Sequence, residues 1–127
     1  MGARRVAILG FLSVACTPSA VSTGRDVTRV SGRLDPAHIQ RVVRSNYGGF
    51  RRCYESGLAR YPALEGRVQV RFVIGRDGRV QDAKSVGSTM PDQHVVNCVV
   101  SKYYGLTFSP PEGGIVIVVY PIMFAPG

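Results

Sequence analysis

Three cysteines carry the clearest chemistry in this sequence, because a thiol can be lipidated, oxidised to a disulfide or bound to a metal. They are Cys16, Cys53 and Cys98. His94 stands four positions before Cys98 and can share a helix face with it, but zinc needs three or four ligands at defined spacing, and the sequence offers no others. We therefore expect no metal site, and we expect His38 and His94 to be surface or capping residues.

The first of these cysteines ends a segment typical of an export signal. Arg4 and Arg5 precede an apolar stretch, residues 6–14, which is too short to span a bilayer. The sequence Leu-Ser-Val-Ala-Cys at residues 12–16 resembles a bacterial lipobox, in which the lipid-bearing Cys becomes the first residue of the mature protein. We expect residues 1–15 to be removed and Cys16 to carry a diacylglycerol. The alternative is cleavage by ordinary signal peptidase.

Residues 16–34 are rich in Ser, Thr, Pro and Gly and predict a flexible tether between the lipid and a folded domain at residues 35–127. Thr17, where an Asp would retain a lipoprotein at the inner membrane, favours the outer membrane. The expected location is therefore the cell envelope, with the protein anchored by lipid on the periplasmic side of the outer membrane.

If Cys16 is lipidated, Cys53 and Cys98 remain, and two cysteines in an exported chain usually pair. In the chain-entropy model their bond would stabilise the fold by about 4 kcal/mol. Free thiols are the alternative.

No residues in the sequence predict catalysis. Eight acidic residues are scattered, mostly at helix starts and turns, and neither histidine has a clear partner. We expect no enzymatic activity and no cofactor. The formal net charge of +8 raises the question of nucleic-acid binding, but the arginines are spread out and no nucleic-acid-binding motif accompanies them, so we expect none. The candidate basic patch comprises Arg41, Arg44, Arg51 and Arg52.

The first predicted element of the domain is helical. Asp35 and Pro36 are a favourable N-cap and first helical residue, and apolar residues then recur at helical spacing until Arg60, ahead of Pro62. Gly48 and Gly49 interrupt this pattern, which predicts a kink or two helices.

Strands and a further helix follow. Alternation of apolar and polar residues over 66–74 predicts a strand, Asp77-Gly78 a hairpin turn, and 79–86 a polar edge strand. A second helix is expected from about Asp92 to Gly105. A third strand is expected over 115–120, limited by Pro121.

This order, α-β-β-α-β, predicts a single α+β domain. A hairpin followed by a right-handed crossover gives a three-stranded, antiparallel-type sheet in the order third, first, second. Both helices should then pack on one face, and Cys53 and Cys98 lie on inner helix faces from which they can meet.

A series of short motifs resembles one known family. They are Cys53-Tyr54-Glu55, Leu58, Pro62-x-Leu64-x-Gly66, Val68-x-Val70-x-Phe72-Val73-Ile74, Asp77-Gly78-x-Val80, Cys98, Phe108-x-Pro110, Gly113-Gly114 and Tyr120-Pro121-x-x-Phe124. Over residues 37–124 the chain is similar to the C-terminal domain of the AgmX/PglI family, a relative of the TonB C-terminal domain. The resemblance implies a TonB C-terminal-like fold and a disulfide between Cys53 and Cys98.

The resemblance also implies a binding module. Domains of this type add an extended partner segment to their third strand, here through Ile115, Ile117 and Val119. The alternative is that this strand is core, with its edge covered by the tether. A second hypothesis is a structural envelope component that binds anionic lipid or cell-wall polymer through the basic patch. The sequence names no partner and leaves both a monomer and a homodimer open.

Overall fold

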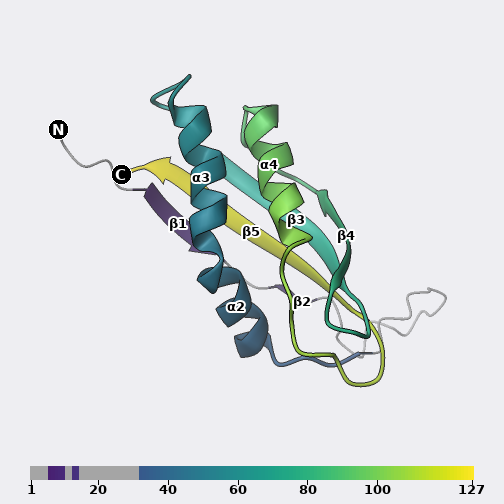
Figure 1. Ribbon diagram of the computed structural model, residues 1–127. Helices are drawn as coiled ribbons and strands as arrows, with labels where there is room; N and C mark the ends of the chain where they lie inside the picture. The colour runs from purple at the N-terminus through teal and green to yellow at the C-terminus, as the bar shows by residue number, and fades with distance from the viewer. Residues whose placement is uncertain (1–5, 11–12, 15–31) are drawn as a thin grey trace.

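The computed structural model describes residues 6–10, 13–14 and 32–127, with side chains for 32–127. The fold is α+β (Figure 1). Its elements are β1 (Val6–Gly10), β2 (Ser13–Val14), α2 (Pro36–Ser45), α3 (Tyr47–Leu58), β3 (Gly66–Ile74), β4 (Val80–Ser85), α4 (Gln93–Tyr103) and β5 (Val116–Pro126).

The predicted sheet order is confirmed. β3 lies between β5 and β4 and is antiparallel to both, which is the order third, first, second. The helices lie on one face of the sheet (Figure 1). The sheet also continues beyond β5, where β1 and β2 pair with its other side.

The two-helix outcome predicted around Gly48 and Gly49 is also observed, but the break falls slightly earlier, at Asn46. The side-chain amide of Asn46 donates to the carbonyl of Val42 at 2.7 Å, which ends α2. At the start of that helix the Asp35 carboxylate accepts the Ala37 N–H at 3.0 Å, as the N-cap prediction requires.

The core lies between the helices and the sheet, and aromatic rings fill its centre. Tyr103 lies 4.8 Å from Phe72 and 5.0 Å from Phe50, measured between ring centroids, and all three side chains are fully buried. Burying one such side chain contributes about 1.5–3 kcal/mol. The alternation along β3 and β5 therefore fixes which face meets the helices, because a one-residue slip would expose every core side chain.

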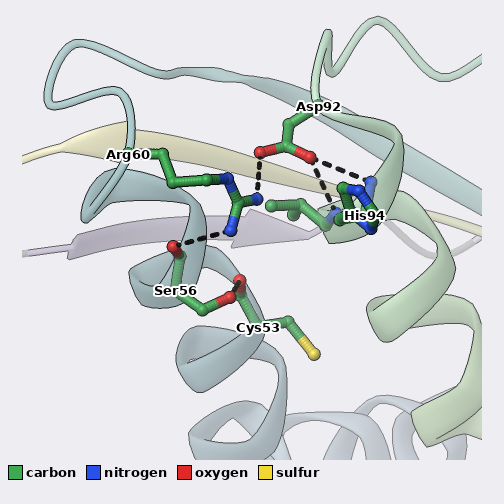
Figure 2. Close-up of polar contacts among 6 residues, drawn as sticks. Cys53, Ser56, Arg60, Asp92 and His94 are labelled. Atoms are coloured by element: carbon green, nitrogen blue, oxygen red, sulfur yellow. Dashed lines mark hydrogen bonds and ion pairs between the residues drawn. The ribbon is translucent and has the colours of Figure 1, made fainter.

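A disulfide joins α3 to α4. The sulfur atoms of Cys53 and Cys98 are bonded at 2.05 Å, with their Cα atoms 5.6 Å apart. Figure 2 shows the Cys53 sulfur emerging from the inner side of α3, close to the polar contacts at the upper end of that helix.

Two sequence-based boundaries change. The third strand runs from Val116 to Pro126 and so passes through Pro121, where we expected it to stop. Gly32 and Arg33, assigned to the tether, belong to the folded domain. The Gly32 N–H donates to the Ile115 carbonyl at 2.9 Å, and the backbones of Arg33 and Glu112 exchange two hydrogen bonds, of 2.8 and 3.0 Å. Cys16, the predicted lipidation site, lies outside the described residues.

Candidate partner-binding edge

The side of β5 that faces away from β3 is the candidate binding edge, and we call it the outer edge. Its backbone groups can be assigned from β3. The Gln69 N–H donates to the Ser88 hydroxyl, and the Gln69 carbonyl accepts the Val86 N–H, so both point toward β4. Gln69 is opposite Pro121 in the antiparallel ladder. The backbone groups of Pro121 must therefore point away from β3, toward the outer edge.

This geometry explains why β5 continues through Pro121. Proline lacks an N–H, but at this position the missing donor is on the outer edge and costs the β3–β5 ladder nothing. By the same alternation, Val119, Met123 and Ala125 present their backbone groups outward.

An apolar segment of the same chain occupies the outer edge. β1 pairs antiparallel with β5 so that Gly10 is opposite Ile122, and β2 pairs so that Ser13 is opposite Val119. The two pairings share one register: Ser13 is three residues after Gly10, and its partner Val119 is three residues before Ile122. These strands come from residues that we predict to be an export signal, and sequence patterns alone gave no indication that they would pair with the domain.

The predicted binding residues divide into two groups. Ile117 and Val119 belong to β5, and their half-buried side chains lie on the sheet face that the helices leave open. Ile115 precedes the strand, and its carbonyl is already bonded to Gly32. The candidate edge therefore runs from Ile117 to Ala125, whereas the sequence predicted a binding strand from Ile115 to Tyr120.

Polar groups from α2 and α3 surround the hydroxyl of Tyr120, a residue of β5 whose side chain lies on the helix side. The Tyr47 and Tyr120 hydroxyls are 3.4 Å apart. Burial raises the pKa of Tyr120 well above its ordinary value of 10.0, and Tyr47 raises it further, while Arg44 and Gln40 act in the opposite direction. The guanidinium of Arg44 thus lies close enough to influence this part of the edge.

The four residues of the predicted basic patch come from two helices. Arg41 and Arg44 are exposed on α2, and Arg51 and Arg52 are exposed on α3. Among the described residues, the carboxylates within ion-pair distance of a cation are Asp92 and Asp82, and neither is paired with these arginines. A depression of about 370 Å³ lies beside Arg52, where Lys102 and the exposed backbone of Gly48 also contribute to its wall.

A larger groove, of about 770 Å³, lies between the end of α3 and the start of α4. Its charged residues are already paired. The Asp92 carboxylate binds the Arg60 guanidinium at 2.5 Å and accepts the N–H of His94 at 2.9 Å (Figure 2). Burial opposes ionisation of Asp92, but these donors and the Val95 N–H outweigh it, so the pKa is lowered from 3.8. We interpret this cluster as the N-cap of α4 and a link between the two helices.

The described part of the chain contains no group of His, Cys, Asp and Glu side chains suited to a metal, and no helix in it is long and apolar enough to cross a membrane. His38 accepts the Ser109 N–H at 3.0 Å, whereas His94 is exposed. Comparison with protein-family models, with curated proteins and with solved structures found no match to this chain.

Proposed function

We propose that this is a non-enzymatic envelope protein whose domain binds an extended segment of a partner protein as an added strand on the outer edge of β5. The observation that carries the proposal is the pairing of β1 and β2 with this edge. An apolar segment fits there, antiparallel and in a single register. The resemblance to TonB-like domains, which bind partners in this way, supports the same interpretation.

Access to the edge depends on the predicted export signal. While they are present, residues 6–10 and 13–14 pair with the outer edge. Removal of residues 1–15 would leave the β5 backbone groups from Val119 to Ala125 facing solvent, ready to pair with another chain. The lipid on Cys16 would keep the domain at the membrane.

Photo-crosslinking in cells tests this proposal. A photoreactive residue is placed at Ile117 or Val119 of β5, and at Lys84 of β4 as the matched control on the opposite edge. We expect the β5 positions to capture one envelope protein and Lys84 to capture none. Equal capture of proteins from β5 and from Lys84, or no capture from β5, would contradict the proposal.

A second candidate function, binding of anionic lipid or cell-wall polymer, is favoured by the depression beside Arg52 and Lys102, which no carboxylate lines. Its test is co-sedimentation with vesicles of anionic or neutral lipid, using Arg52→Gln. Binding that needs anionic lipid and Arg52, and that is lost at high salt, would support this function instead.

A further inference from the structure

The flank of α2 that carries Gln40 and Arg44 lies on the β5 side of the molecule. On α2, Ile39 and Val43 face the core with no exposed surface. Successive residues of an α-helix are rotated by about 100° around its axis. Gln40 and Arg44, each one residue after a core residue, therefore lie on one flank of α2. His38, one residue before Ile39, lies on the other flank.

His38 fixes the direction of the opposite flank. Its ring lies 6.1 Å from that of Phe108, and Phe108 in turn stacks on Phe72 of β3. The His38 flank therefore faces the loop that follows α4. The Gln40 and Arg44 flank faces the other way, toward the outer edge.

The contacts at Tyr120 agree with this direction. Arg44 and Gln40 both act on the Tyr120 hydroxyl, which lies next to that of Tyr47, three residues beyond Arg44. The end of α2 thus lies near the Tyr120 hydroxyl, on the helix side of β5. A strand added to the outer edge at Tyr120 would come close to Arg44.

Charge at this point is unbalanced. Arg41 and Arg44 are exposed, and no described carboxylate lies within ion-pair distance of either. β5 itself has no charged residue. The arginine guanidinium is always charged, and it offers paired N–H donors to a carboxylate.

We propose that the partner segment carries an acidic side chain opposite Tyr120, on the helix side, where Arg44 and Gln40 bind it. This inference rests on the proposed function. The residues on either side of the acid point to the open face, beside Val119 and Pro121. If the partner strand pairs with β5 in the same register as β1 and β2, its acidic residue stands two positions after its residue opposite Ile122.

Two synthetic peptides test this inference. Both copy the sequence of residues 6–14, of which residues 6–10 and 13–14 pair with β5, and carry either Leu12→Glu or Leu12→Gln, two positions after the residue opposite Ile122. The two differ by one charge at nearly constant shape. The protein is purified from cells that express the full-length gene, mass spectrometry determines its N-terminus, and fluorescence anisotropy measures binding.

We expect the Glu peptide to bind about fivefold more tightly than the Gln peptide at low salt, as for a partly exposed ion pair. In Arg44→Gln the two peptides should bind equally. In Arg52→Gln, which removes the same charge from α3, the preference should persist.

Equal binding of both peptides to the unmodified protein would overturn the acidic-residue inference and leave strand addition standing. Loss of the preference for the Glu peptide in Arg52→Gln would also overturn the acidic-residue inference, because it would indicate a general charge effect. If neither peptide bound to protein that begins at Cys16, strand addition on β5 would be contradicted as well. Protein that kept residues 1–15 would contradict the exposed edge on which both proposals depend.

Discussion

The two strands that flank β3, namely β4 and β5, are built differently. β4 is short, carries Asp82 and Lys84, and has an irregular register with β3 at Val73 and Ile74. The Tyr104 hydroxyl also accepts the outward N–H of Ala83 at 2.9 Å. Short length, charge, irregular pairing and a side-chain cap all discourage further pairing at an edge.

β5 has almost none of these protections. It is longer, its residues are uncharged, and its one deterrent on the outer edge is the missing N–H of Pro121. In the structure, β1 and β2 supply the pairing that the strand itself does not discourage. The difference suggests that β4 terminates the sheet, whereas β5 requires an occupant, either the chain's own segment or a partner.

The largest expected effect concerns the disulfide, which ties α3 to α4 and so holds together the helices above both edges. Replacing Cys53 and Cys98 with alanine should lower the free energy of unfolding by about 4 kcal/mol, because the closed loop is long. Urea unfolding with and without reductant measures this. The double variant should not respond to reductant, and a loss below about 1 kcal/mol would contradict the expectation.

Proline substitutions at neighbouring positions of β5 separate its two sides. Val118→Pro removes an N–H that pairs with β3 and should destabilise the fold by about 3 kcal/mol. Val119→Pro removes an outward N–H and should cost about 1 kcal/mol or less, while weakening peptide binding several-fold. Thermal unfolding and anisotropy measure the two effects. If Val119→Pro unfolded the domain as readily as Val118→Pro, our assignment of the outer edge would be wrong.

Tyr104→Phe should weaken the protection of β4. Loss of the hydroxyl leaves the Ala83 N–H without its acceptor, at a cost of about 1 kcal/mol. Hydrogen exchange at Ala83 should accelerate while exchange at Val118 stays unchanged. An unaltered Ala83 rate would show that this hydroxyl does not protect the edge.

The smallest effect lies away from both edges. Because the pKa of Asp92 is lowered in the folded state, its stabilising contribution is present above the unfolded pKa of about 3.8 and is lost as the pH falls through the folded pKa. Asp92→Asn keeps a good N-cap but removes the charge. Its stability should depend less on pH below about 4, as thermal unfolding can measure. If Asp92→Asn lost thermal stability at low pH as much as the parent protein does, other carboxyl groups would be responsible for that loss.

Local patterns predicted most of the domain. The alternation over Gly66–Ile74 gave β3 with its full bounds, and Asp35 gave the start of α2. These signals are local, since they depend on periodicity and on hydrogen bonds between near neighbours.

The features that escaped prediction depend on contacts between distant residues. The course of β5 through Pro121 follows from the direction of Gln69 in another strand. The Tyr104 cap on β4 and the influence of Arg44 on the pKa of Tyr120 likewise require the folded chain. Pairing of residues 6–10 and 13–14 with β5 was the hardest to foresee, because the same apolar run also fits an export signal.

The most direct test of an exposed outer edge on β5 is hydrogen exchange, residue by residue along that strand, in the protein purified from cells after its N-terminus has been determined. We expect an N-terminus at Cys16, fast exchange at the outward amides of Val119 and Met123, and slow exchange at the inward amides of Val118 and Ile122. The peptide that copies residues 6–14 should then slow the outward pair alone. Outward amides that are already protected in the purified protein, with residues 6–14 still present, would show that β5 is permanently covered and would contradict the central claim.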